Sequence, residues 1–213
     1  MPSKNTVKIY TPDTAFHVYN HGVEKRRIFE DAQDYEKFQN YLNVYLSPPK
    51  IIHEKEPLLR ANLVKNNLFG AADLLAFCLM PDHFHLLIFQ KSANGITRLM
   101  KQIATAYSMY FNKKYNRVGA LFQGTFKGAP VQTAEQLLYL TRYIHKHPLE
   151  RGVSLQDFRW SSYTAYIGPE TLPFVSPRKI LDFLKNNNPG LSYENFVEKE
   201  KEDTGPINSL LME

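Results

Sequence analysis

The segment LLAFCLMPDHFHLLIFQ, residues 74–90, holds two apolar runs separated by a short break. The runs extend from Leu74 to Met80 and from His85 to Gln90, with Pro81 and Asp82 between them. Short apolar runs on either side of a turn signal are typical of neighbouring strands. The segment therefore predicts an antiparallel pair of strands.

Further strands and helices are expected on both sides of this pair, and their order predicts an α+β fold with helices packed on one face of a mostly antiparallel sheet. Residues 50–73 contain Pro57 and Gly70 and predict an irregular connector. Alternation, helical spacing and capping residues locate the other elements. These are a strand at 15–20, a helix from Asp31 to about Leu46, a helix at 95–115, a strand at 129–132, a helix from Thr133 to Pro148 and a helix near 178–185.

The composition is that of an ordinary globular protein. The chain has 213 residues, 43% of them hydrophobic, which suits one main domain. The single cysteine, Cys78, lies inside an apolar run, so we expect it in the core and the protein in a reducing compartment. No apolar stretch approaches the ~18–20 residues that span a bilayer, and the N-terminus lacks the apolar part of a secretion signal. We therefore expect a soluble, cytoplasmic protein.

Positive charge is concentrated in one part of the chain. Between Arg98 and Arg151, nine Lys or Arg residues oppose two acids, a net charge of +7, whereas the residues from Gly190 onward carry −4. Eight Phe or Tyr residues are interleaved with the basic ones. Such a surface suits a phosphate backbone and exposed bases, although each aromatic residue taken singly fits the core better. The charge segregation favours a polyanionic partner.

Two histidines open the second strand of the pair. His83 and His85 are two residues apart, so in a strand both imidazoles point to one face while Phe84 points into the core. Neutral imidazoles suit a divalent transition metal, and Mg²⁺ or Mn²⁺ becomes suitable when phosphate oxygens complete the shell. Histidines are also common at the ends of strands, so this triplet alone does not establish a metal site.

A second cluster ends the last core helix. Tyr143 and His147 are four residues apart and share a helix face, whereas His145 faces elsewhere. Tyr143 could attack a phosphorus atom while His147 adds a third ligand to an ion held by the strand histidines. A tyrosine at a boundary between helix and sheet also fits a purely structural role.

Five segments together resemble the REP-associated branch of the single-tyrosine HUH transposases. Their order and spacing extend over about residues 14–168. The segments are HVYNHG at 17–22, CLMPDHFHLL at 78–87, LFQG with Phe126 and Lys127 at 121–127, residues 139–148 with Gly152, and WSSY at 160–163.

The resemblance implies a ferredoxin-like catalytic domain, which we place at 1–168. The sequence pattern predicts that a C-terminal helical extension with a mobile acidic tail follows at 169–213. The resemblance also implies an enzyme that cleaves and rejoins single-stranded DNA near a hairpin, through a 5′-phosphotyrosine and a free 3′ hydroxyl. A divalent metal, Mg²⁺ or Mn²⁺, is the implied cofactor. The sequence leaves monomer and homodimer open.

Residue by residue, the resemblance makes His83 and His85 the paired metal ligands and Tyr143 the nucleophile. The position four residues later is often Asn or Gln in this family and is His147 here, which keeps a side chain able to bind metal. Asp82 stands where Asn is commoner. Our expected DNA contacts are Arg98, Lys101, Arg117, Lys127 and Arg142 to phosphates, and Phe122 and Phe126 to bases.

Two other functions compete with this one. The first is a transposase-derived protein that binds hairpin DNA or RNA without cutting it, and it would tolerate the loss of Tyr143. The second is a metal hydrolase in which the three histidines activate water. The lack of an evident companion Asp or Glu near the histidines argues against the hydrolase.

Overall fold

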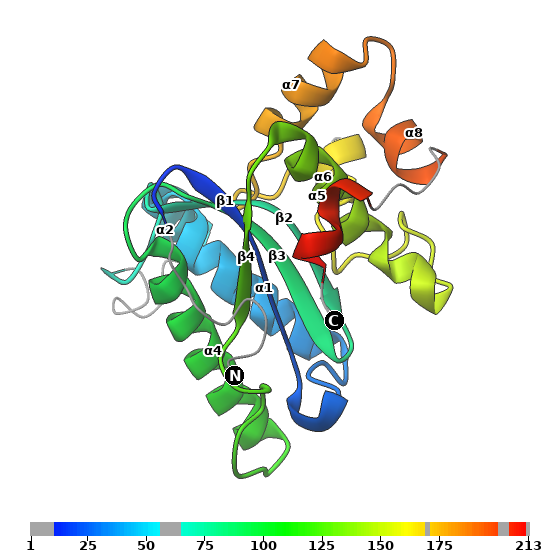
Figure 1. The fold of residues 1–213 in the computed structure, drawn as a ribbon. Helices are drawn as coiled ribbons and strands as arrows, with labels where there is room; N and C mark the ends of the chain where they lie inside the picture. The colour runs from blue at the N-terminus through cyan, green and yellow to red at the C-terminus, as the bar shows by residue number, and fades with distance from the viewer. Residues whose placement is uncertain (1–10, 56–64, 169–170, 200–204, 212–213) are drawn as a thin grey trace.

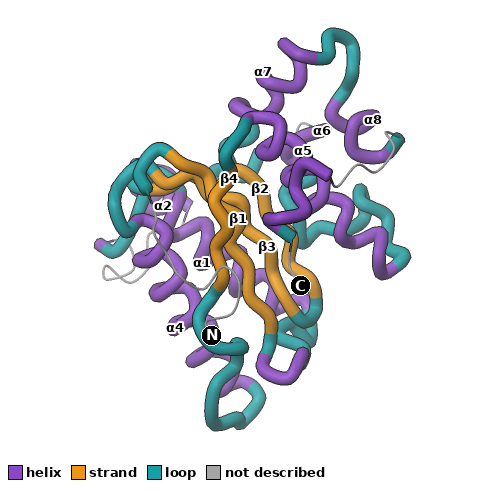
Figure 2. The backbone as a smooth tube through the Cα atoms, in the orientation of Figure 1, coloured by secondary structure: helices purple, strands orange, loops and turns teal. Residues whose placement is uncertain are grey.

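The core of the fold is a four-stranded sheet in the order β2-β3-β1-β4 (Figures 1 and 2). All its pairings are antiparallel, and β1 lies between β3 and β4. This computed structural model describes residues 11–55, 65–168, 171–199 and 205–211. The strands are β1 (Thr14–His21), β2 (Ala72–Met80), β3 (His83–Gln90) and β4 (Lys127–Val131). The predicted α+β class and antiparallel sheet are confirmed.

Two long helices cover one face of the sheet, α1 (Ala32–Leu46) and α4 (Gly95–Lys114) (Figure 1). Alternate strand residues such as Phe16 and Leu86 join their apolar faces in one core cluster. Asp31 caps α1 as expected, since its side chain accepts a hydrogen bond from the backbone N–H of Asp34.

The other face is also covered, by α5 (Ala134–Lys146) and the C-terminal extension. The expectation of helices on a single face therefore holds for α1 and α4 but not for α5. The reason lies in the strands, since Cys78 and Leu87 point away from α1 and α4 and are fully buried. The elements on this side are η2 (His147–Arg151), α6 (Thr164–Ile167), α7 (Arg178–Asn187), α8 (Tyr193–Glu198) and η3 (Gly205–Leu210).

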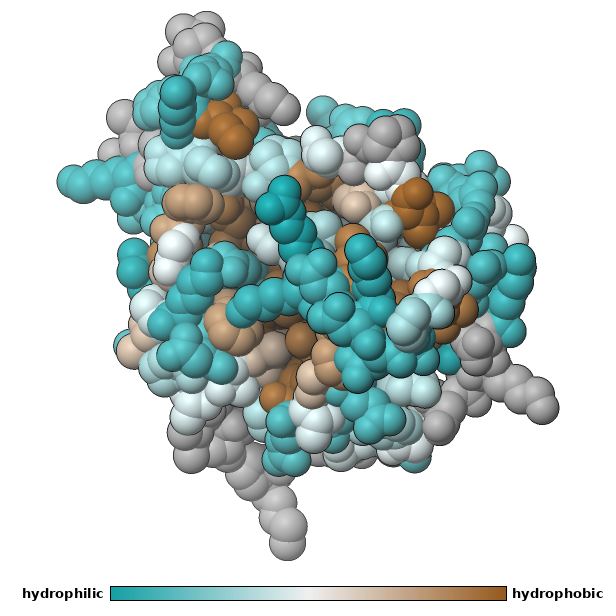
Figure 3. Space-filling view, turned by 90° about the horizontal axis from the view of Figure 1, so that it is seen from above, coloured by the Kyte–Doolittle hydropathy of each residue, from teal (hydrophilic) through white to brown (hydrophobic). Residues whose placement is uncertain are grey.

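The connector between α1 and β2 contains α2 (Pro49–Lys55), and residues 56–64 lie outside the described residues. A short 3-10 turn, η1 (Val23–Lys25), follows β1. Seen from above, the surface is mainly hydrophilic, with apolar residues in small separate patches (Figure 3). Within the described residues, no helix is both long and apolar enough to cross a membrane.

The C-terminal tail differs from the expectation of a mobile segment. Residues 200–204 and 212–213 lie outside the described residues, but η3 packs against α5 and β4. Ile207 and Leu210 are buried in the same core cluster as α5. These two apolar side chains fix this part of the tail to the core, which the acidic composition of the segment did not indicate. The division of the chain at residue 168 stays a prediction.

Candidate metal centre and nucleophile

His83 and His85 lie on the same face of β3, the face covered by α5. Phe84 between them points to the opposite face, where it is 1% exposed and packs on Phe38 and Phe122. The sequence-based expectation for this triplet is therefore correct. The strand alternation alone positions both imidazoles, since β3 pairs with β1 through this segment without a register shift.

The helix α5 carries Tyr143, and His147 follows directly as its C-cap and the first residue of η2, so that both lie over the two strand histidines. The His147 ring centroid lies 5.0 Å from that of His83, 4.5 Å from that of His85 and 5.2 Å from that of Tyr143. The Tyr143 ring is 5.7 Å from the His85 ring. Tyr143 is half-buried, whereas the three histidines are buried. The phenol therefore stands at the accessible side of a closed histidine cluster.

The three histidines fit a metal ion. One ring nitrogen of each lies within 4.8 Å of those of the other two. Among the described residues, Nε2 of His83, Nε2 of His85 and Nδ1 of His147 are buried without a hydrogen-bond partner. Buried polar atoms are nearly always hydrogen-bonded, so three such nitrogens at one place call for a ligand. A divalent cation held by imidazoles is the ligand that this donor set suits.

Burial keeps these imidazoles neutral. It lowers the pKa of His83 to about 4, with a further decrease from the neighbouring His147. It also lowers the pKa of His85 well below its ordinary value and the pKa of His147 in the same direction. Metal binding requires the unprotonated imidazole, so at neutral pH the cluster is in its binding form.

Each strand histidine has a second partner that orients its ring. The Oδ1 atom of Asp82 lies 2.9 Å from Nδ1 of His83 and also accepts a hydrogen bond of 3.0 Å from Arg151. Nδ1 of His85 lies 2.8 Å from Nε2 of His17. A ring nitrogen hydrogen-bonded in this way leaves the other free to face an ion.

Two carboxylates stand near the cluster, contrary to the sequence-based argument against a hydrolase. Asp82 contacts His83, and Oε1 of Glu150 lies 3.5 Å from Nδ1 of His147. Asp82 was visible in the sequence as the neighbour of His83. Glu150 was not assigned because the predicted helix ended at Pro148, whereas η2 continues to Arg151 and brings Glu150 one turn from His147.

His17 is another member of the site that sequence reasoning missed. It lies on β1 and is fully buried, and its ring stacks on that of His85 at 5.1 Å. The alternation of β1 could have placed it on one face with Tyr19, but not beside His85, because the pairing register was unknown. His145, by contrast, faces away as predicted, with Nδ1 at 2.8 Å from the Tyr193 hydroxyl and Nε2 at 2.7 Å from the Ser162 hydroxyl.

The expected phosphate contacts are spread over both sides of the sheet. Arg98 and Lys101 are exposed on α4, on the side away from the histidines. Arg117 is half-buried and bonds to the Asn112 side chain. Lys127, on β4, pairs with Tyr19 on β1, and the Nζ of Lys127 lies 5.9 Å from the Tyr19 ring. Because paired residues share a face, Lys127 is the expected cation that lies on the histidine face.

Arg142 does not fit the expected DNA contact. It is 4% exposed, and its guanidinium lies 5.3 Å from the Phe196 ring. The helix α8 covers this side of α5, which the helical spacing of the sequence could not reveal. We therefore correct this prediction and leave Arg142 out of the DNA surface.

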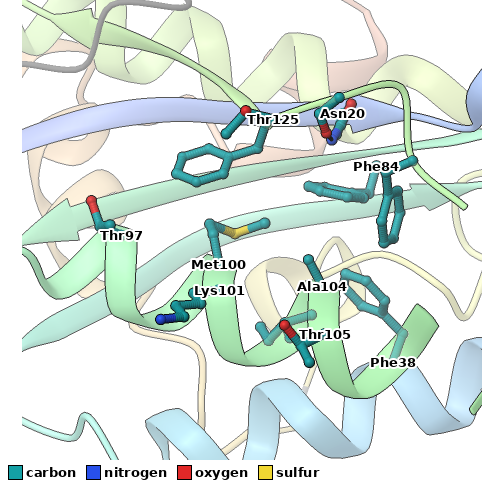
Figure 4. Close-up of a pocket in the computed structure, with 13 residues that line it drawn as sticks. Asn20, Phe38, Phe84, Thr97, Met100, Lys101, Ala104, Thr105 and Thr125 are labelled. Atoms are coloured by element: carbon teal, nitrogen blue, oxygen red, sulfur yellow. Dashed lines mark hydrogen bonds between the residues drawn. The ribbon is translucent and has the colours of Figure 1, made fainter. Parts of the chain in front are cut away.

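Phe122 and Phe126 are also more buried than expected, at 8% and 9% exposed. Both belong to the core cluster beneath α4, and both line a cavity of about 600 Å³ between that helix and the sheet (Figure 4). Lys101 and Met100 reach the same cavity from α4. Neither phenylalanine is an open stacking platform, and a base could contact them only by entering the cavity.

Comparisons with known proteins agree with the resemblance inferred from the sequence. The sequence model of the family described as "Transposase IS200 like" matches residues 56–147, a span that contains all three cluster histidines and Tyr143. No curated protein sequence matches the chain significantly.

Among solved structures, a REP-associated tyrosine transposase bound to a REP hairpin is similar to this chain with a TM-score of 0.50 and 10% identity. The match covers 80% of this chain and 89% of that one. A tRNA(His) guanylyltransferase from Saccharomyces cerevisiae matches with a TM-score of 0.30 and 12% identity, covering 89% of this chain and 83% of that one. The second score is too low to support an argument, whereas the first indicates a shared fold.

Proposed function

Taking as the premise that the chain is similar to the IS200-like transposases, we propose that it is a metal-dependent transposase that cleaves and rejoins single-stranded DNA through Tyr143. One observation carries the proposal. Tyr143 stands over three buried histidine nitrogens that have no hydrogen-bond partner among the described residues. A phenol beside three nitrogens that can bind a metal suits attack on a phosphodiester better than it suits a structural role.

The proposed metal ligands are His83, His85 and His147. A bound divalent ion, Mg²⁺ or Mn²⁺, would neutralise a non-bridging phosphate oxygen. Three neutral imidazoles leave its net charge unreduced, so phosphate oxygens are the natural partners for the remaining positions. Asp82 and His17 hold the rings of the two strand histidines in the orientation that this requires.

Tyr143 is the proposed nucleophile. Its Oη forms a bond to phosphorus while the bond from phosphorus to the 3′ oxygen breaks. The phenol proton passes to solvent, and the departing 3′ oxygen takes a proton to become a free hydroxyl. The product is a 5′-phosphotyrosine, and attack on it by another 3′ hydroxyl reverses the exchange and joins strands. No nucleotide cofactor is consumed.

The proposed substrate is single-stranded DNA that carries a hairpin. Lys127 lies on the histidine face and is the proposed contact for a phosphate near the cleaved one. Arg98, Lys101 and Arg117 would hold more distant phosphates, because their charges lie along or just after α4. We propose that the protein acts on DNA in the cytoplasm. The free, buried thiol of Cys78 is consistent with a reducing compartment of this kind.

The experiment compares wild-type protein with Tyr143→Phe on a pool of single-stranded, hairpin-containing oligonucleotides with Mn²⁺. Wild-type protein should form a covalent adduct that survives denaturing electrophoresis, and Tyr143→Phe should form none while binding the DNA equally well. Tyr139→Phe, one turn earlier on α5 and half-buried, is the matched control and should keep the adduct.

The competing functions give different results in the same experiment. A protein that only binds DNA forms no adduct and releases no fragment even as wild type. If the protein is a hydrolase in which Glu150 or Asp82 assists a water molecule, the Tyr143→Phe variant continues to cut the DNA. Either outcome would refute the proposed role of Tyr143.

A further inference from the structure

His17 connects the metal cluster to the C-terminal segment of the chain. Its side chain is fully buried on β1, between η3 and His85. Nδ1 of His17 lies 2.6 Å from the backbone carbonyl oxygen of Leu210, and Nε2 lies 2.8 Å from Nδ1 of His85. The three groups form one hydrogen-bonded line that ends at a proposed metal ligand.

The direction of this line follows from which groups can donate. A carbonyl oxygen only accepts hydrogen bonds, so Nδ1 of His17 carries a proton and donates a hydrogen bond to the Leu210 carbonyl oxygen. A fully buried imidazole is neutral and carries one ring proton, so Nε2 of His17 is an acceptor. Nδ1 of His85 must therefore donate to it, and Nε2 of His85 is left with its lone pair. That is the atom that faces the cluster without a partner among the described residues.

We propose that His17 is a positioning residue that, anchored by the carbonyl of Leu210, holds His85 in the one tautomer able to bind a metal ion through Nε2. The inference rests on the proposed function, because it gives His17 the task of orienting His85, one of the three proposed metal ligands. It makes η3 a part of the metal site, although η3 contributes no ligand.

The two strand histidines are then oriented by different means. His83 donates to the Asp82 carboxylate, which is its neighbour in the chain and is itself held by Arg151. His85 depends on a neutral imidazole and on a carbonyl that is 193 residues from His17 in sequence. The partner of His83 forms locally, whereas the carbonyl that anchors His17, the partner of His85, is in place only when η3 is docked.

Two substitutions separate this role from simple packing. His17→Phe keeps an aromatic ring against His85 and Tyr143 but removes the acceptor. His17→Gln loses the ring, yet its side-chain carbonyl can accept a hydrogen bond at about the place of Nε2. A packing role predicts that Phe is the better replacement, whereas the positioning role predicts that Gln is.

The measurement is the affinity of the full chain for Co²⁺ alone, by calorimetry and visible absorption, with thermal unfolding as the check of folding. His17→Phe should weaken Co²⁺ binding by about 10- to 100-fold, the usual loss for an outer-shell partner of a metal-bound histidine. His17→Gln should bind more tightly than His17→Phe. Equal affinity of wild type and His17→Phe, or tighter binding by His17→Phe than by His17→Gln, overturns the inference.

A second measurement does not depend on any variant folding. Long-range ¹H–¹⁵N correlation of the metal-free wild-type protein reports the tautomer of each histidine, and both His17 and His85 should carry their proton on Nδ1. A proton on Nε2 of His85 would overturn the inference while leaving the proposed function in place. Wild-type protein that binds no Co²⁺ would instead overturn the proposed metal centre, and the inference with it.

Discussion

Acid should destabilise the metal-free protein through His145, which stands outside the proposed ligand set. Its side chain is 0% exposed and contacts the hydroxyls of Tyr193 and Ser162. Burial lowers its pKa from 6.5 to about 3. Because its partners are neutral, nothing compensates the cost of placing a charge there.

The sign and size of the effect follow from the difference in bound protons. At pH 5 the unfolded chain protonates His145 almost completely, whereas the native protein keeps it neutral. The unfolded state therefore binds more protons, and stability falls as the pH falls from about 7 towards the folded pKa. Between pH 7 and pH 5 the loss assigned to this one residue is about 2 kcal/mol.

The assay is urea unfolding in EDTA at pH 7 and pH 5. His145→Gln lacks the titrating group but can still bond to the two hydroxyls, so it should lose about 2 kcal/mol less than wild type between the two pH values. His53→Gln, at an exposed position on α2, is the control and should lose as much as wild type. An equal loss by His145→Gln and wild type would refute the reasoning.

Three further predictions concern the core, a tight turn and the DNA surface. Lys114→Met should cost about 3 kcal/mol in urea unfolding, because Asp34, which is fully buried, would lose its cationic partner at 2.8 Å. Gly22→Ala should lower the unfolding free energy by about 1–3 kcal/mol, since the new Cβ would lie 2.2 Å from the Arg26 carbonyl oxygen; unchanged stability would show that the turn yields easily. Lys101→Gln should reduce the slope of log affinity against log salt for hairpin DNA by about 1, and an unchanged slope would exclude a phosphate contact there.

The parts of the fold that could be predicted are those set by short-range periodicity. The alternation around Phe84 was sufficient to place both strand histidines on one face, and the helical spacing of α5 was sufficient to separate Tyr143 and His147 from His145. These predictions needed no knowledge of which strand pairs with which.

What could not be predicted depends on contacts between distant segments. The burial of Arg142 by α8 and the docking of Leu210 beside His17 both come from a C-terminal extension whose sequence is mainly polar. Phe122 and Phe126 were assigned to the surface because a basic, glycine-containing loop resembles a binding loop whether its aromatic side chains point outward or inward. Only the register of the sheet and the place of α4 decide between the two.

The hydrogen bond between His17 and Leu210 also sets an order of events during synthesis. Both strand histidines, Tyr143 and His147 leave the ribosome well before Leu210 does. At ~5–20 residues per second, several seconds pass in which all three proposed metal ligands have been synthesised but Leu210, which anchors the partner of His85, has not. A growing polypeptide close to nucleic acid would therefore hold its proposed metal centre incomplete until translation reaches η3.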